Sequence, residues 1–140
     1  MTERLAIVSL GSNLGDRAAF LEKATAAVAA LPQTRLVAAS EPEETEPVGV
    51  PPEFADLKFL NGVAVFMTSL SPEAFAAALH GIEDSLGRVR TVKNGPRTID
   101  LDLVDYDGEV RSSPELTLPH PRAKERGFVT RPLARLGIML

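Results

Sequence analysis

Apolar positions in the first half of the chain fall into short continuous runs separated by a segment with helical spacing. The runs at residues 5–10, 36–40 and 59–68 have the length and composition of strands. Between the first two runs, apolar residues recur every three or four positions from Asp16, a suitable N-cap, until Pro32. This half of the chain therefore predicts a strand, a helix and two further strands.

The second half contains one more helix and one more strand. Ser71-Pro72-Glu73 combines an N-cap, a proline for the first turn and an acidic residue, and the helix should run to about Leu86 before Gly87 ends it. Residues 99–106 predict a strand, and Asp107-Gly108 a turn. Apolar residues alternate within this strand, so one of its faces should belong to the core.

In two longer segments the apolar residues show no regular spacing. Residues 41–58 are rich in proline and acidic side chains and predict a surface loop, while 114–126 is loop-like and precedes a short apolar tail. Long loops of this kind are more often functional than idle. The element order favours an α+β sandwich, with helices on one face of a mainly antiparallel sheet, formed as a single domain over residues 1–140.

Composition narrows the class of protein. The chain has 140 residues, of which 44% are hydrophobic and 24% charged, as in ordinary globular domains. It lacks cysteine, a signal-peptide pattern and any apolar run of the ~18 residues that a membrane span needs. We expect a cytoplasmic, monomeric protein that binds no membrane. The net charge of −4 and the scattered basic residues argue against nucleic acid as a partner, since a nucleic-acid footprint should appear as a basic stripe rather than one compact cluster.

Two aspartates interrupt the last strand. Asp100 and Asp102 alternate with Ile99, Leu101 and Leu103, so both carboxylates should lie on one face while the apolar residues enter the core. Like charges roughly 7 Å apart repel unless a cation lies between them. An all-oxygen pair suits Mg²⁺, which usually shares its coordination with water and substrate phosphates. The pattern indicates a candidate phosphate-transfer site.

An isolated pair of aspartates with this spacing more often lies on the solvated face of a half-exposed strand and binds nothing. Its surroundings favour the other interpretation, because four cations precede it within about ten residues in a mildly acidic chain. They are Arg88, Arg90, Lys93 and Arg97. A cluster of cations beside paired carboxylates is typical of a site for an anion and its metal.

Several short motifs then occur in a characteristic order. They are Leu10-Gly11-Ser12-Asn13-Leu14-Gly15-Asp16-Arg17, Thr45-Glu46-Pro47-Val48-Gly49, Phe59-Leu60-Asn61, Glu83 before Leu86-Gly87-Arg88-Val89-Arg90, Gly95-Pro96-Arg97-Thr98-Ile99-Asp100-Leu101-Asp102, and Leu118-Pro119-His120-Pro121-Arg122 with Arg126-Gly127-Phe128. Together they cover nearly the whole chain, which resembles the 6-hydroxymethyl-7,8-dihydropterin pyrophosphokinases of folate biosynthesis. The resemblance implies a ferredoxin-like fold and transfer of pyrophosphate from ATP to the pterin's hydroxymethyl oxygen, with AMP leaving.

The resemblance also implies roles for individual residues. Asp100 and Asp102 would hold two Mg²⁺ ions, while Arg88 and Arg97 would act on the phosphates. Nucleotide contacts would come from Glu83, Arg90, Leu103, Thr117, His120 and Arg126. The pterin would lie between Phe59 and Phe128, with Asn61 at its edge and Thr45 and Val48 lining the pocket. Gly11-Ser12-Asn13 is read mainly as a turn between strand and helix.

One alternative class stays open. The same sandwich could be a non-catalytic module that binds pterin or nucleotide, or a ferredoxin-like interaction domain with a solvated pair of aspartates. A relative that had lost catalysis should lack Asp100, Asp102 or Arg97, and all three are present.

Overall fold

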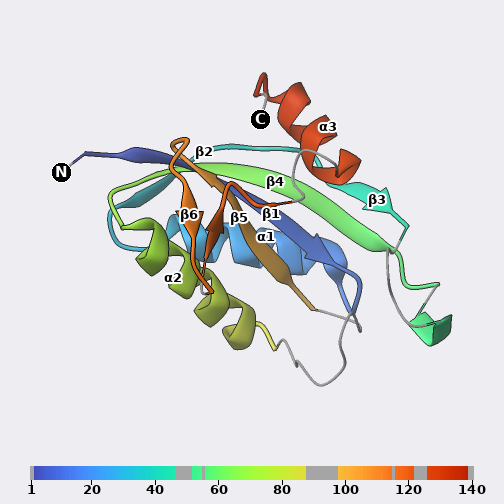
Figure 1. The fold of residues 1–140 in the computed structure, drawn as a ribbon. Helices are drawn as coiled ribbons and strands as arrows, with labels where there is room; N and C mark the ends of the chain where they lie inside the picture. Colours follow the sequence, from blue (N-terminus) through green and yellow to red (C-terminus); the bar gives the residue numbers. More distant parts are fainter. Residues whose placement is uncertain are drawn as a thin grey trace.

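The computed structural model describes residues 2–46, 52–54, 56–87, 98–114, 116–121 and 126–138. Its main sheet has the order β2-β4-β1-β5, with β3 beside one end of β4, and every described strand pair is antiparallel (Figure 1). The strands are β1 (Arg4–Ser12), β2 (Thr34–Ala39), β3 (Glu43–Thr45), β4 (Phe59–Thr68) and β5 (Asp100–Tyr106). A separate pair is formed by β6 (Arg111–Ser112) and β7 (Thr117–Leu118). The predicted α+β fold with a mainly antiparallel sheet is confirmed.

In the described part of the chain, three helices pack on this sheet, and a short 3-10 turn, η1 (Pro52–Phe54), precedes β4. Helix α1 (Arg17–Ala29) begins where the sequence predicts, because the Asp16 carboxylate accepts a hydrogen bond from the Ala19 amide at 3.2 Å. Helix α2 (Pro72–Ser85) is capped in the same way by Ser71. It ends just before Gly87, whose φ of +85° favours glycine after a helix. The third helix is α3 (Gly127–Arg135).

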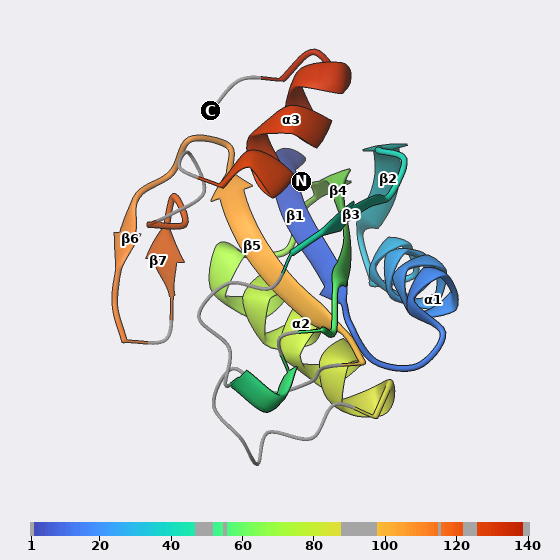
Figure 2. The ribbon, with the colours of Figure 1, turned by 90° about the vertical axis from the view of Figure 1, so that its right-hand side faces the viewer.

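The two predicted helices, α1 and α2, share one face of the sheet as expected, but α3, which was not predicted, covers the other face. Helices α1 and α2 enclose the larger core, which includes Phe66, Phe75 and Leu79. Helix α3 packs on the opposite face, where Val129 and Leu133 meet residues of β1, β4 and β5 (Figure 2). A sheet with apolar side chains on both faces must be covered on both sides.

A β-bulge in β5 explains how one strand supplies both cores. Val8 of β1 pairs with Leu103 and Ile7 with Asp105, which leaves Val104 as the extra residue. Val104 consequently faces α3, while Leu103 and Tyr106 both enter the larger core. Strict alternation from Leu103 would have placed Asp105 there instead of Tyr106.

Two predicted loops contain regular structure. The segment 41–58, expected to be a loop throughout, includes β3, which pairs with the first residues of β4. The segment 114–126 includes β7, and the expected apolar tail forms α3. The partners of β3 and α3 lie in more distant parts of the chain, and β7 is only two residues long, so the local sequence pattern of each is weak.

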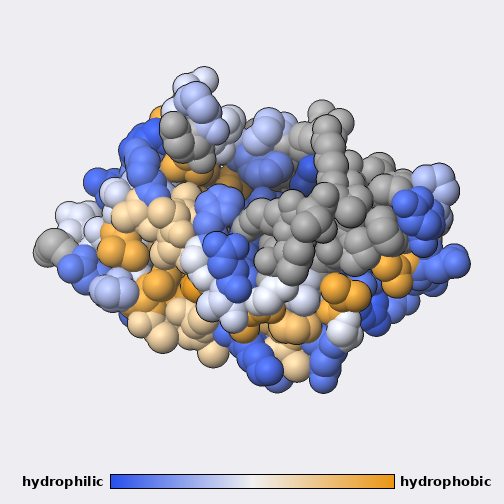
Figure 3. Space-filling model, turned by 90° about the horizontal axis from the view of Figure 1, so that it is seen from below, coloured by the Kyte–Doolittle hydropathy of each residue, from blue (hydrophilic) through white to orange (hydrophobic). Residues whose placement is uncertain are grey.

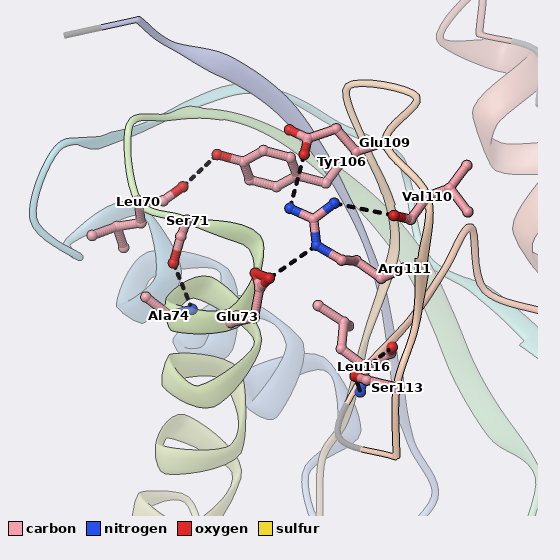
Figure 4. Close-up of polar contacts among 10 residues, drawn as sticks. All are labelled: Leu70, Ser71, Glu73, Ala74, Tyr106, Glu109, Val110, Arg111, Ser113 and Leu116. Carbon is pink, nitrogen blue, oxygen red and sulfur yellow. Dashed lines mark hydrogen bonds and ion pairs between the residues drawn. The ribbon is translucent and has the colours of Figure 1, made fainter.

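The region around β6 is tied to the start of α2 (Figure 4). Arg111 donates hydrogen bonds to Glu73 and Glu109 at 2.9 Å each, and the bond to Glu73 lowers the pKa of that carboxylate. The Tyr106 hydroxyl donates to the carbonyl of Leu70, and burial raises its pKa. These contacts fix the far end of β5 against the loop that enters α2.

Apolar residues also reach the surface on the side of α1 and α2 (Figure 3). Alanines on the outer sides of these helices account for part of this surface, since Ala18, Ala26, Ala74 and Ala77 are exposed. None of the described helices combines the length and the apolar character that crossing a membrane would require.

Candidate active site

The register of the sheet brings residues from three strands into one row. Asp100 of β5 lies opposite Gly11 of β1, and Gly11 lies opposite Asn61 of β4. Directly opposed residues share a face, and this face is the one that carries α3. Asp102 lies opposite Ser9 on the same face. The prediction that the two aspartates share a face is therefore confirmed.

The apolar partners of these aspartates occupy the other face, as predicted. Ile99, Leu101 and Leu103 are buried in the larger core beneath β5. Asp100 and Asp102 are both partly exposed. The larger core thus anchors one face of β5, while the two carboxylates lie on the opposite face and remain accessible to a ligand.

Gly11 makes room for the side chains beside it. A Cβ atom at this position would lie 2.8 Å from Oδ1 of Asn61 and 3.4 Å from the ring of Phe59. Asn61 is almost fully buried, and its amide nitrogen donates to the hydroxyl of Thr45 on β3. Three of the residues expected at the pterin, Phe59, Asn61 and Thr45, therefore lie together next to a strand residue without a side chain.

We predict that Gly11→Ala weakens pterin binding more than it weakens the fold. The added methyl group would approach Asn61 Oδ1 to 2.8 Å, so the Asn61 amide must move. The Michaelis constant for the pterin should rise about tenfold, a cost of roughly 1.4 kcal/mol, while that for ATP changes little. Steady-state kinetics with each substrate varied in turn measures both constants, and an unchanged pterin constant would contradict this role of Gly11.

A shallow depression lies next to the aspartates. It is lined by Ser9, Asp102, Val104, His120, Arg126 and Val129. His120 is held there by its own amide, which donates to the carbonyl of Val104 at 2.8 Å, and Arg126 stands immediately before α3. The depression combines one carboxylate, one imidazole and one guanidinium, a set that can bind a phosphorylated ligand together with its metal.

The surroundings of His120 favour its neutral form. Partial burial lowers the pKa of His120 below its ordinary value, and the cation of Arg126 lowers it further, against the opposite effect of Asp100. A neutral imidazole can both donate and accept a hydrogen bond. His120 can therefore contact a nucleotide without adding a positive charge at neutral pH.

This pKa shift predicts a pH dependence of stability. As pH falls through about 6.5, the unfolded chain takes up the His120 proton more readily than the folded protein, so stability is lost on acidification. The decrease in melting temperature between pH 7.5 and 5.5 should be smaller in His120→Gln than in the wild type. Thermal unfolding followed by circular dichroism tests this, and equal decreases would show that His120 has no such effect.

Phe128 and Arg126 begin α3 on the same face. The Arg126 guanidinium lies 5.6 Å from the centre of the Phe128 ring, and Phe128 packs against the smaller core. Helix α3 is also tied to β3, because Arg131 donates to Glu43 at 3.0 Å and Arg135 lies 3.2 Å from it. The Arg131 hydrogen bond lowers the pKa of Glu43. These contacts link the strand that carries Thr45 to the helix that carries Phe128.

A second group of ion pairs joins the two ends of the segment between β3 and β4. Arg17 donates to Glu44 of β3 at 2.9 Å and to the carbonyl of Lys58, just before β4, at 3.0 Å. Lys58 in turn lies 3.4 Å from Glu46. The first residue of α1 therefore holds both ends of the chain segment that contains Val48.

Three residues expected at the nucleotide do not line this depression. Leu103 points into the larger core, and Thr117 is exposed on β7. Glu83 is buried on α2, on the face of the sheet opposite the aspartates. These residues lie along or beneath the outer edge of β5, so a nucleotide that touched them would have to follow that edge.

Four predicted site residues fall outside the described residues: Val48, Arg88, Arg90 and Arg97. The structure adds Ser9, Gly11 and Val129, which sequence reasoning had not assigned to the site. Gly11 and Ser12 belong to β1, so reading them as a turn is wrong. Alternation along β1 from Ile7 would have placed Ser9 and Gly11 on one face.

The donor groups fit a metal ion that is shared with phosphate. Among the described residues, no group of three or more His, Cys, Asp or Glu side chains could enclose an ion unaided. Two carboxylates on one face leave most coordination positions to water and phosphate oxygens, which is how Mg²⁺ is usually bound. The residues present therefore fit a magnesium–nucleotide site better than a closed structural one.

Comparison with known proteins places this arrangement in a family. Residues 7–137 match the model of the family described as 7,8-dihydro-6-hydroxymethylpterin-pyrophosphokinase (HPPK). The chain is 41% identical over 132 residues to the 2-amino-4-hydroxy-6-hydroxymethyldihydropteridine pyrophosphokinase of Methylorubrum extorquens, covering 94% of this chain and 82% of the relative. The enzyme of the same name from Bacillus subtilis (strain 168) is 39% identical over 132 residues, covering 94% and 77%.

Further matches include larger proteins. The folic acid synthesis protein fol1 of Schizosaccharomyces pombe is 38% identical over 134 residues, which are 96% of this chain and 18% of that protein. A solved structure described as HPPK-DHPS in complex with substrates has a TM-score of 0.69 at 12% identity, covering 96% of this chain and 40% of the other. At that identity the likeness supports the fold alone. The family match and the relatives near 40% identity decide the assignment: the chain belongs to the 7,8-dihydro-6-hydroxymethylpterin pyrophosphokinase family.

Proposed function

We propose that this protein transfers the terminal pyrophosphoryl group of ATP to the hydroxymethyl oxygen of 6-hydroxymethyl-7,8-dihydropterin, in a reaction that depends on Mg²⁺. Its family membership supports the activity and a nucleotide co-substrate. The observation that carries the site assignment is the row Asn61, Gly11 and Asp100, with Asp102 beside it. This row sets a buried amide at one end and a pair of carboxylates at the other.

The carboxylate end would receive the triphosphate. Asp100 and Asp102 would hold two Mg²⁺ ions, which supply charge neutralisation of the phosphate oxygens when bound. Arg126 and His120 lie next to Asp102 in the same depression and would contact the nucleotide. Arg88, Arg90 and Arg97 would add guanidinium contacts to the phosphates, whose planar forks match phosphate oxygens.

The amide end would receive the pterin. Asn61 presents hydrogen-bonding groups for the edge of a flat heterocycle, and its orientation is fixed by Thr45. Phe59 and Phe128 would stack on the two faces of the ring. The row would then point the pterin's hydroxymethyl group toward Asp100, so that positioning and electrostatics supply the rate without a covalent intermediate.

Formation of AMP tests this proposal. Purified protein is incubated with ATP and the pterin alcohol, with and without Mg²⁺, and AMP and pterin diphosphate are quantified by chromatography. Both products should appear in equal amounts, and only when all three components are present. Binding of ATP and pterin without AMP formation would instead support the non-catalytic module.

A further inference from the structure

Glu83 is a fully buried carboxylate that the reaction described above does not use directly. It lies on α2 with 1% of its surface exposed, on the face of the sheet opposite Asp100 and Asp102. Its Oε2 atom accepts a hydrogen bond from the backbone amide of Leu101 at 2.8 Å. Leu101 is the residue between the two aspartates.

The position of Leu101 in the sheet explains why this contact matters. In the described sheet, β5 pairs with β1 along one edge only, so alternate amides of β5 point away from β1. A buried amide without an acceptor costs about 1–3 kcal/mol. Glu83 supplies that acceptor from α2.

The hydrogen bond therefore fixes the backbone at the centre of the aspartate pair. Rotation of the peptide plane at Leu101 would change the direction of the side chains on both sides, because Asp100 and Asp102 are its neighbours. The other carboxylate oxygen of Glu83 lies 3.2 Å from Nδ1 of His80, which is largely exposed. That contact leaves Oε2 directed at the strand.

We propose that Glu83 is a positioning residue: its carboxylate, by accepting the Leu101 amide, sets the spacing and direction of Asp100 and Asp102 for the metal–nucleotide complex. This inference rests on the proposed function of the aspartates. In this inference Glu83 holds the backbone of β5 in place, whereas the resemblance implies that it contacts the nucleotide. A helix on one face of the sheet thereby controls the geometry of carboxylates on the other.

Two substitutions separate the hydrogen bond from the charge. Glu83→Gln keeps an oxygen that can accept from Leu101 and removes the charge, whereas Glu83→Asp keeps the charge on a side chain one methylene shorter. The exchange rate of the Leu101 amide and the affinity for Mn²⁺ should change only in the variant that loses the hydrogen bond to Leu101. His80→Ala is the matched control, since it removes the neighbour of the other oxygen and leaves the Leu101 contact intact.

The first measurement needs no metal. Amide hydrogen exchange of Leu101, followed by NMR in the metal-free protein, should be at least about tenfold faster in Glu83→Asp than in the wild type. Glu83→Gln and His80→Ala should stay within about threefold of it. The second measurement is Mn²⁺ binding by electron paramagnetic resonance with a non-hydrolysable ATP analogue. The affinity of the protein for Mn²⁺ should fall about 10- to 100-fold in Glu83→Asp, but not in Glu83→Gln or His80→Ala.

Several outcomes would overturn the proposal. If Glu83→Gln lost Mn²⁺ affinity as fully as Glu83→Asp, the charge of Glu83 would matter and the Leu101 contact would not. If Glu83→Asp matched the wild type in exchange and in binding, Glu83 would not position the strand. The proposed function fails separately, through absence of AMP formation in the wild type while the exchange result for Leu101 still holds.

Discussion

Replacement of Asp100 or Asp102 by asparagine should lower the turnover number at least about a hundredfold, a loss of roughly 2.7 kcal/mol of transition-state stabilisation. Asparagine keeps the size of the side chain but removes the charge that would hold Mg²⁺. The fold should survive, because both residues are partly exposed and removing one of two like charges relieves repulsion. Turnover is measured as AMP formation over a range of Mg²⁺ concentrations, and stability by thermal unfolding.

Asp105→Asn is the matched control. Asp105 lies on the same strand, but its carboxylate accepts from the amide of Gly108 at 3.2 Å in the turn that follows. This variant should keep the turnover of the wild type. Near wild-type activity in Asp100→Asn or Asp102→Asn, with the same dependence on Mg²⁺, would refute the assignment of these residues to the metal.

Truncation of Leu133 on α3 should damage both the fold and the pterin site. Leu133 is 1% exposed and packs in the smaller core that attaches α3 to the sheet. Leu133→Ala should cost about 2–5 kcal/mol of stability, which corresponds to a fall in melting temperature on the order of 10 °C. It should also raise the Michaelis constant for the pterin, because the start of α3 carries Phe128.

Leu79→Ala provides the comparison on the opposite face. Leu79 is 2% exposed in the larger core under α2, so its truncation should cost a similar amount of stability. Only Leu133→Ala should change the pterin constant, at a temperature where both variants are folded. Equal effects of the two substitutions on pterin binding would show that general destabilisation, and not the placement of α3, is responsible.

Local patterns were sufficient for the longest elements and for the central pair of aspartates. Asp16 and Ser71 form the caps that the sequence predicts, and β4 occupies the predicted residues 59–68. The alternation of Ile99, Leu101 and Leu103 with Asp100 and Asp102 assigns each set to its face. These features depend on contacts within a few residues, which a single sequence records directly.

The short elements could not be predicted in the same way. Strand β3 is acidic and flanked by proline, and it exists because Glu43–Thr45 pair with the beginning of β4. Helix α3 contains Pro132 and starts at glycine, so its local preference for a helix is low. Its buried residues Val129, Pro132 and Leu133 do have helical spacing, and this was the one signal available in the sequence.

The sequence by itself determined the main helices and strands, the shared face of Asp100 and Asp102, and the resemblance that led to the family. Only the tertiary structure decided that Asn61, Gly11 and Asp100 form one row, that α3 covers the face of this row, and that Glu83 accepts a hydrogen bond from the amide of Leu101. Strand register, a β-bulge and the docking of a short helix arise from pairings between distant segments. Their free energy comes from burial and hydrogen bonds that do not exist until the sheet has formed.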